Sequence, residues 1–279
     1  MASNSSLDLF YDAVLTLTKS AGQIIREKNL ERNKYVEFKK SPKDLVTETD
    51  KQVERYLIDG IAGKFPDHKF IGEESSKEIV LTDAPTWVID PIDGTMNFVH
   101  SFPHSCISIA LYVNKQPVIG IVYNPMLEQL FTARKGQGAY LNGQPIKVSQ
   151  VKTLSTALLM LENWGPSPNY QLTPEVQEHL KSLSDDSHSS RCLGSAALDL
   201  CMVACGAAEA YYSYGLQVWD IAAGELIVTE AGGMVTDVNG GPLDRLAKRM
   251  LATNNKEIND ALAERLVALE EKMKKKGDL

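Results

Sequence analysis

Cysteine is scarce in this chain, with only four among 279 residues: Cys106, Cys192, Cys201 and Cys205. Four cysteines are too few for a disulfide scaffold of this size, and no two of them form a Cys-x-x-Cys pair. The spacing of Cys201 and Cys205 places both on one helix face, but no histidine lies near them in sequence to complete a metal site. We therefore interpret the cysteines as buried thiols in a reducing compartment.

Long hydrophobic runs are absent as well. No stretch of about 18 apolar residues could span a membrane. The segment Met1–Ser6 is polar and lacks the basic and then apolar pattern of a signal peptide. We therefore expect a cytoplasmic protein.

Positive charge is in deficit, with 29 Lys and Arg against 36 Asp and Glu and a net charge of −7. This balance argues against a nucleic-acid partner, because phosphate backbones attract clustered cationic surface. It also argues against binding to an anionic membrane surface. A small anionic substrate, handled with the help of metal cations, is compatible with it.

The remaining composition is that of a globular protein, with 43% hydrophobic residues. Apolar periodicity predicts helices over residues 7–28, 50–65, 174–183, 195–206, 221–231 and 256–276. Apolar runs bounded by turn residues predict strands over residues 87–89, 107–113, 117–123, 129–133, 158–162, 191–192, 210–214 and 235–238. Short turns between the strands of residues 105–141 favour antiparallel pairing.

The chain shows no flexible linker. Residues 31–43 read as a polar connector carrying the basic pair Lys39 and Lys40. A boundary near residues 149–153 would divide the chain into residues 1–150 and 151–279, but we expect these halves to share one core. We therefore treat residues 1–279 as a single unit.

Two carboxylates lie in one tight turn. The apolar strand 87–89 runs directly into Asp90-Pro91-Ile92-Asp93-Gly94-Thr95, where Pro91 restricts the backbone and Gly94 permits close approach. Carboxylates this close would raise each other's pKa unless a cation sat between them. Mg²⁺ fits, because it prefers oxygen ligands and is held by carboxylates, waters and substrate phosphate. The alternative is a turn with two ordinary surface aspartates.

Spacing separates this turn from rival motifs. An EF-hand loop starting at Asp90 would need an oxygen ligand at Ile92 and a glutamate at Ser101, so it is excluded. A haloacid-dehalogenase-type phosphatase resembles Asp-x-Asp-Gly-Thr, whereas here two residues intervene, and it is kept as an alternative. Pro103 breaks any helix that would align His100 and His104 on a zinc ion. No Gly-x-Ser-x-Gly elbow supports a serine hydrolase.

Other polar positions could join the two aspartates. Glu73 follows Gly72 in a predicted turn after an apolar strand. Asp220 precedes the predicted helix 221–231, which makes it a candidate N-cap. The small residues Gly194-Ser195-Ala196 open another helix, where either a phosphate could reach backbone amides or the helix could pack closely.

Three motifs carry a resemblance to a known family. They are Gly72-Glu-Glu-Ser75, Asp90-Pro-Ile-Asp-Gly-Thr-Met-Asn-Phe98 and Trp219-Asp-Ile-Ala-Ala-Gly224, with Glu230-Ala-Gly-Gly233 after the last. In this order they resemble the inositol monophosphatase family, within a wider superfamily of lithium-sensitive, metal-dependent phosphatases. The resemblance runs from about Leu7 to Asn255.

The resemblance implies a fold, a cofactor and an activity. The fold is α+β: a layered α-β-α-β-α sandwich of helices and mixed, mostly antiparallel sheets, in a homodimer. The activity is Mg²⁺-dependent hydrolysis of a small phosphate monoester, most often myo-inositol monophosphate, by direct attack of a metal-activated water. Lithium inhibition is also implied.

The resemblance also assigns metal ligands. Glu73, Asp90 and the carbonyl of Ile92 would hold one Mg²⁺, and Asp90, Asp93 and Asp220 a second. Glu73 would also help to hold a more labile third ion.

Catalytic roles follow from the same resemblance. Thr95, hydrogen-bonded to Asp50, would help to activate the water together with Glu73. Lys39 would lie on a loop that closes over the metals, or else on an ordinary solvated loop.

Substrate contacts follow in the same way. The backbone amides of Gly94 and Thr95 would meet the phosphate, and the helix start Gly194-Ser195-Ala196 is a further candidate substrate contact. The polyol hydroxyls would meet Asp93, Ala196 and Asp220, and a fourth family position that Ser213 occupies here. At Ser213 the chain departs from the family, which usually has glutamate there. Because serine is shorter and uncharged, a bidentate hold on two ring hydroxyls is lost. The same chemistry on another small phosphate (sugar phosphate, glycerol phosphate or phosphoadenosine phosphate) and a catalytically silent metal-binding paralogue are therefore kept as alternatives.

Overall fold

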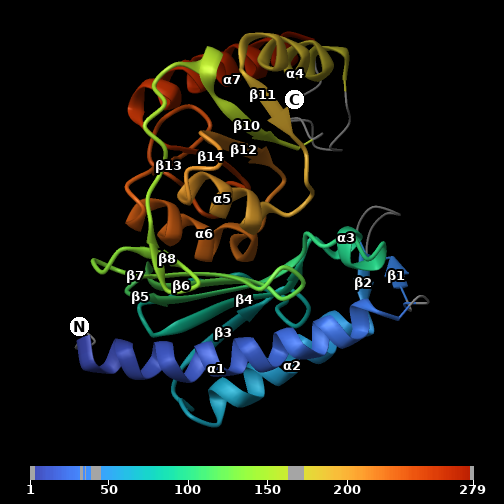
Figure 1. Cartoon of the computed structure of the whole chain (residues 1–279), viewed down its shortest axis with the longest axis vertical. Helices are drawn as coiled ribbons and strands as arrows, with labels where there is room; N and C mark the ends of the chain where they lie inside the picture. The colour runs from blue at the N-terminus through green and yellow to red at the C-terminus, as the bar shows by residue number, and fades with distance from the viewer. Residues whose placement is uncertain (1–3, 32–33, 35, 39–44, 163–172, 277–279) are drawn as a thin grey trace.

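The protein, seen in a computed structural model, is built of five stacked layers of helices and sheets (Figure 1). The structure describes residues 4–31, 34, 36–38, 45–162 and 173–276. The layers are two helices, a large sheet, two helices, a smaller sheet and two further helices, which confirms the predicted α-β-α-β-α sandwich. Among the described residues, no helix combines the length and apolar character needed to cross a membrane.

In the described part of the chain, the larger sheet has seven strands in the order β3-β4-β5-β6-β7-β8-β9. Their bounds are β3 Lys69–Gly72, β4 Thr86–Asp93, β5 Cys106–Val113, β6 Gln116–Asn124, β7 Gln129–Arg134, β8 Ala139–Leu141 and β9 Gln144–Ile146. Strands β3 and β4 pair in parallel, and every other neighbouring pair is antiparallel. The antiparallel pairing predicted from the short turns is confirmed.

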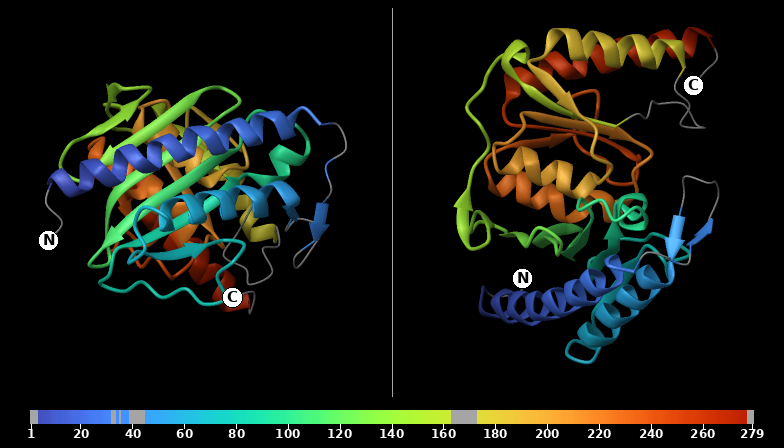
Figure 2. Two further views of the ribbon diagram at one scale, coloured as in Figure 1. Left: turned by 90° about the horizontal axis from the view of Figure 1, so that it is seen from below. Right: turned by 45° about the vertical axis from the view of Figure 1, so that its right-hand side comes forward.

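Two long helices cover the outer face of this sheet (Figure 2). They are α1 (Asn4–Asn29) and α2 (Glu48–Ala62), which pack on each other and on β6 and β4 respectively. Their apolar faces form one buried cluster with the sheet, in which Val14, Leu57 and Trp87 are fully buried. Thr47 caps α2 by accepting hydrogen bonds from the first turn, so the start of this helix is fixed in place.

The second sheet is mixed. Among the described residues it has five strands in the order β11-β10-β12-β14-β13, namely β10 Leu158–Leu161, β11 Ser189–Arg191, β12 Ala210–Tyr214, β13 Met234–Thr236 and β14 Arg249–Thr253. Its outer face carries α4 (Pro174–Asp186) and α7 (Lys256–Lys276) (Figure 1). Its inner face carries α5 (Ala196–Ala204) and α6 (Val218–Glu230).

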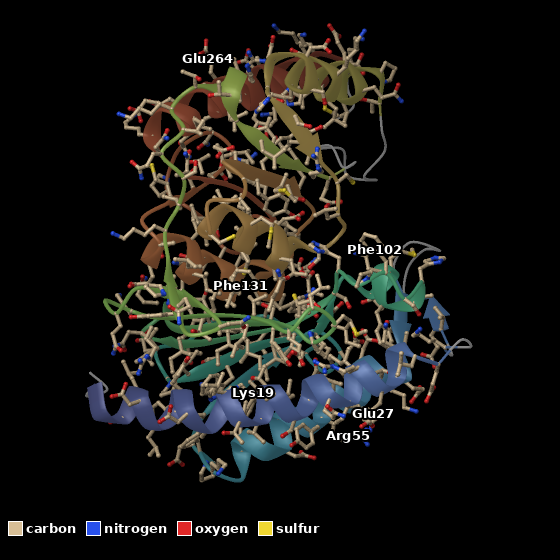
Figure 3. All side chains as sticks on the ribbon, in the orientation of Figure 1. Lys19, Glu27, Arg55, Phe102, Phe131 and Glu264 are labelled. Carbon is tan, nitrogen blue, oxygen red and sulfur yellow. The ribbon has the colours of Figure 1, made fainter. Side chains whose placement is uncertain are left out.

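The middle helices join the two sheets. Gly120 of β6 lies so close to α6 that a Cβ there would come within 2.7 Å of the Ala223 carbonyl oxygen. Phe131, labelled in Figure 3, belongs to one buried cluster with residues of α5 and α6 such as Leu200 and Ile227. The division into residues 1–150 and 151–279 stays a prediction, but this core draws on both halves.

Several elements differ from the sequence predictions. The connector 31–43 contains β1 (Val36–Phe38), which pairs antiparallel with β2 (Leu45–Thr47). Strand β4 continues to Asp93 instead of ending at Asp90. The predicted strand 235–238 is shifted to β13. Helix α3 (Thr95–Val99) and the short strands β8, β9 and β14 were not predicted, because elements of three to five residues show no clear period.

Candidate active site

Asp90 and Asp93 stand at the end of β4, where the strand leaves its regular register. Asp90 faces Ser108 of β5 and Asp93 faces Cys106, with a register shift between the two aspartates. The shift accommodates Pro91, which has no N–H to donate to the ladder. One carboxylate oxygen of Asp90, Oδ1, accepts a hydrogen bond from the Ile92 N–H at 3.0 Å, which orients this buried side chain.

Asp220 comes from the first turn of α6, but it is not the N-cap. The N-cap is Gln217, and Asp220 occupies the third helical position, from which its Oδ2 accepts the Gln217 N–H at 2.7 Å. The predicted N-cap role was therefore wrong by three residues. A carboxylate at either position is stabilised by the free amides of a helix N-terminus, so the sequence signal was the same.

These three carboxylates converge. Asp90, Asp93 and Asp220 each offer one oxygen, and the three oxygens lie within 4.8 Å of one another. One carboxylate oxygen of each residue also accepts a backbone N–H, in Asp93 that of Ala197 at 2.8 Å. The group can hold a metal ion.

The electrostatics of the cluster demand a cation. Desolvation, followed by the charges of Glu73, Asp93 and Asp220, raises the pKa of Asp90 well above its usual value. Desolvation also raises the pKa of Asp93 to about 6, although hydrogen bonds from Ser195 and Ala197 oppose the rise. The pKa of Asp220 is raised by burial and then by Asp93 and Glu73. A divalent cation would relieve all three penalties together.

Glu73 faces this cluster from the turn that follows β3. Its N–H donates to the Ile89 carbonyl of β4 at 3.1 Å, which ties the turn to the strand that carries Asp90. The Glu73 charge contributes to the raised pKa values of Asp90, Asp93 and Asp220. Glu73 is therefore close enough for its charge to act on all three aspartates, although within the described residues the oxygens that lie within 4.8 Å of one another come from the aspartates.

The N-terminus of α5 holds one of the metal-site carboxylates. Ser195 is the N-cap residue, and its hydroxyl donates to Asp93 Oδ2 at 2.5 Å, beside the Ala197 N–H. Ala196 begins the helix between these two donors. Gly194 adopts a φ of +76°, and its N–H donates to Glu162 at 2.8 Å. The anion that this helix end binds is thus Asp93.

Thr95 and Asp50 meet beside the cluster. The Thr95 hydroxyl lies 3.3 Å from Asp50 Oδ1 and 3.0 Å from the Ile92 carbonyl oxygen, and it donates its single proton to one of them at a time. Asp50 Oδ2 accepts hydrogen bonds from the Thr47 hydroxyl and N–H. Burial raises the pKa of Asp50 to about 6, against the opposing effect of these hydrogen bonds.

Gly94 lies where two loops meet. Its φ is +84°, and a Cβ there would come within 3.0 Å of the carbonyl oxygens of Gly194 and His104. Asn97 of α3 ties the same loops together, because its Nδ2 donates to the carbonyls of His104 at 2.7 Å and Leu193 at 2.6 Å. Asn97 belongs to the quoted motif, but nothing local in the sequence indicated this bridging role.

One sequence candidate stands apart from these contacts, and another falls outside the described residues. Ser213 is buried in β12, and its hydroxyl donates to the Tyr214 carbonyl at 3.3 Å. Lys39 lies outside the described residues.

The cysteine interpretation needs one correction. Cys106 and Cys201 are buried and Cys205 is half-buried, but Cys192 is exposed. Cys106 Sγ lies 3.7 Å from Asp93 Oδ2, so this thiol borders the metal-site carboxylates.

A buried polar pair behind α5 was missed entirely. His104 Nε2 lies 3.8 Å from Asp199 Oδ1, too far for a hydrogen bond, and within the described residues neither atom has a hydrogen-bond partner. Burial, followed by the neighbouring carboxylate of Glu162, raises the pKa of Asp199 well above its usual value. Burial lowers the pKa of His104 to about 4. The pair joins the segment just before β5 to α5 across 95 positions of the sequence.

Replacing Asp199 with asparagine should stabilise the protein at high pH. The native carboxyl is protonated near pH 4 and its charge becomes an increasing penalty as the pH rises, whereas an amide carries no charge and can donate to His104 or Glu162. We expect Asp199→Asn to raise the free energy of unfolding by about 1–3 kcal/mol at pH 8 and by much less at pH 4.5. Urea unfolding at both pH values measures this, with Asp83→Asn on the surface as the control. An equal gain at both pH values would contradict the explanation.

Comparison with known proteins identifies the family of the chain. The sequence model of the Inositol monophosphatase family matches residues 6–271. Bos taurus Inositol monophosphatase 1 is 44% identical over 259 residues, which cover 91% of this chain and 93% of the relative. A solved structure of a Thermotoga maritima IMPase superposes with a TM-score of 0.85 at 32% identity, covering 94% of this chain and 98% of the other.

A third relative is known in two ligand complexes. The structure of SaIMPase-II bound to inositol monophosphate has a TM-score of 0.78 at 32% identity and covers 94% of this chain and 98% of that one. The structure of the same protein bound to 2′AMP has a TM-score of 0.80 at 34% identity, with 96% and 99% covered. From the match over nearly its whole length, the chain belongs to the inositol monophosphatase family and is a phosphoric monoester hydrolase.

Proposed function

We propose that the protein hydrolyses myo-inositol monophosphate to myo-inositol and phosphate, with Mg²⁺ as cofactor. The observation that carries this proposal is the convergence of Asp90, Asp93 and Asp220, whose oxygens lie within 4.8 Å of one another in a buried setting. A set of oxygen donors suits Mg²⁺ better than it suits softer metals.

The ligands proposed for the ions follow the family resemblance and agree with the burial of the site. Glu73, Asp90 and the Ile92 carbonyl would hold one Mg²⁺, and Asp90 with Asp93 and Asp220 a second. A third, weaker ion would depend on Glu73. When bound, Mg²⁺ lowers the pKa of a coordinated water and neutralises phosphate charge.

Asp50 and Thr95 are proposed as the proton-handling pair. The Thr95 hydroxyl can take a proton from an attacking water while it passes its own proton to Asp50 Oδ1, 3.3 Å away. A pKa of about 6 suits Asp50 for this task near neutral pH. Thr47 fixes the far oxygen of Asp50, so the near oxygen is kept toward Thr95.

Substrate contacts are proposed along the same rim. The amides of Gly94 and Thr95 would meet the phosphate, and the absence of a side chain at Gly94 lets this turn pack against the carbonyls of Gly194 and His104. The hydroxyls of the polyol would meet Asp93, Asp220 and the segment Gly194-Ser195-Ala196. At Ser213 a hydroxyl takes the place of the family glutamate, so recognition of the ring is weaker there than in the family.

That substitution supports a second candidate, the same reaction on another small phosphate. SaIMPase-II has been seen with both inositol monophosphate and 2′AMP, so one member of this fold accepts two different phosphates. Recognition of a sugar phosphate, glycerol phosphate or phosphoadenosine phosphate would depend less on contacts to the hydroxyls of an inositol ring.

Phosphate release from a substrate panel tests the proposal. We expect inositol 1-phosphate to be the best substrate in the presence of Mg²⁺. EDTA should abolish its hydrolysis, and added Mg²⁺ should restore the activity. The panel includes a sugar phosphate, glycerol phosphate, 2′AMP and phosphoadenosine phosphate. A better rate on one of these would favour the second candidate. Inactivity on all of them, with Mg²⁺ still bound, would indicate a silent paralogue.

We also propose a homodimer, cytoplasmic location and lithium inhibition. The first and last rest on the family resemblance. The buried thiols Cys106 and Cys201 suit a reducing compartment.

A further inference from the structure

Helix α2 presents a second buried carboxylate to the site. Glu54 follows Asp50 by one helical turn and is only 2% exposed. Asp50 reaches Thr95, whereas Glu54 lies against the turn that carries Glu73. Burying a carboxylate costs free energy unless its oxygens accept hydrogen bonds. The contacts of Glu54 therefore indicate what its carboxylate does in the fold.

Those contacts hold the turn closely. Glu54 Oε2 accepts the Glu74 N–H at 2.8 Å. A Cβ added at Gly72 would come within 2.5 Å of the Glu54 carboxyl carbon, so the carboxylate lies flush against the Gly72 backbone. Ser76 closes the turn, because its hydroxyl accepts the Gly72 N–H at 2.9 Å.

We propose that Glu54 is a positioning residue for the metal site, holding the turn 72–76 so that the Glu73 carboxylate faces Asp90. Two hydrogen bonds fix the backbone at Glu73. The Glu73 N–H donates to the Ile89 carbonyl, and the next N–H, that of Glu74, donates to Glu54 Oε2. This inference rests on the proposed function insofar as Glu73 is taken as a metal ligand.

Truncating Glu54 should weaken metal binding. Glu54→Ala leaves the Glu74 N–H without its acceptor and opens space against Gly72, so the turn can relax away from the cluster. Outer partners of ligands typically contribute 10–100-fold in metal affinity or activity. Glu54→Gln keeps the length of the side chain and an acceptor oxygen, so it should restore most of the affinity.

Binding of Mn²⁺, followed by electron paramagnetic resonance, tests this on the full chain without substrate. We expect Glu54→Ala to weaken Mn²⁺ binding by about 10-fold or more, and Glu54→Gln by about 3-fold at most. In turnover, the Mg²⁺ concentration for half-maximal rate should rise in Glu54→Ala while kcat at saturating Mg²⁺ is largely kept. The control is Glu48→Gln on the same helix, where the side chain is 66% exposed.

Gly72→Ala gives an independent variant, because its methyl group would displace the Glu54 carboxylate. If Glu54→Ala fails to fold, Gly72→Ala decides: weakened Mn²⁺ binding supports the proposal, and wild-type binding overturns it. A folded Glu54→Ala with wild-type Mn²⁺ affinity also overturns it, as does a Glu54→Gln as weak as Glu54→Ala. If the wild-type protein binds no Mn²⁺, the metal-dependent function itself fails.

Discussion

Asp90→Asn should reduce kcat/KM by about 1,000-fold or more. Asp90 is the ligand proposed for both main Mg²⁺ ions, and metal catalysis supplies several kcal/mol of transition-state stabilisation, at about 1.4 kcal/mol for each factor of ten. The same substitution should raise the melting temperature of the metal-free protein, because burial and three neighbouring carboxylates make the Asp90 charge unfavourable there. Loss of activity and gain of stability together distinguish a functional carboxylate from a structural one.

The asparagine side chain makes this test clean. Its oxygen can still accept the Ile92 N–H that Asp90 Oδ1 accepts now, so the end of β4 keeps its shape. Asp59→Asn, on the exposed face of α2, removes the same charge away from the cluster and should change neither quantity. Full activity of Asp90→Asn at saturating Mg²⁺ would contradict the proposed ligand set.

Local pattern was enough to locate the aspartates of β4, but not the shape of the strand. The apolar run 87–89 predicted that the chain would bring Asp90 and Asp93 close together after a buried strand, and both are buried at the end of β4. Pro91 argued for a strand end, since it has no N–H for a ladder. In the structure a register shift against β5 carries the strand past Pro91 to Asp93. A bulge depends on the partner strand, which no local pattern reveals.

Helix register limited the prediction at Asp220 in a similar way. Gln217 is an uncommon N-cap residue, so the more usual Asp220 was preferred. The helix begins earlier because Val218 and Ile221 are both buried in the core between the sheets. The carboxylate that joins the cluster was thus found from the sequence, whereas its position in the helix was decided by packing.

Contacts between distant residues were beyond any sequence pattern. His104 and Asp199 carry no shared motif, and their proximity exists only because β5 and α5 pack together. Glu54 is spaced from Asp50 as residues on one helix face are, but its role depends on the turn after β3. Such residues become visible only when the layers are assembled.

Stabilisation by Mg²⁺ should depend strongly on pH. The pKa of Asp50 and of Asp93 is raised to about 6, and burial and neighbouring carboxylates raise the pKa of Asp90 and of Asp220 well above the usual 3.8. The folded metal-free protein therefore holds more protons than the unfolded chain above pH 4, so its stability falls as the pH rises from about 4 through 6. Mg²⁺ needs the deprotonated carboxylates, so it should have little effect at pH 4.5 and a large one at pH 8.

Melting curves with Mg²⁺ or EDTA across this pH range measure the effect. At 100 times its dissociation constant an ion adds about 2.7 kcal/mol, which corresponds to about 5 °C in melting temperature for a protein of this size. Burial lowers the pKa of His104 and of His179, which affects the melting temperature equally with Mg²⁺ and with EDTA. This effect therefore cancels in the difference between the two melting temperatures. NaCl at equal ionic strength controls for screening of surface charge. Only groups that must lose protons to bind the ion couple its affinity to pH. A rise in melting temperature with Mg²⁺ that is the same at pH 4.5 and pH 8, or that persists in Asp90→Asn, would therefore show that these carboxylates do not hold the ion.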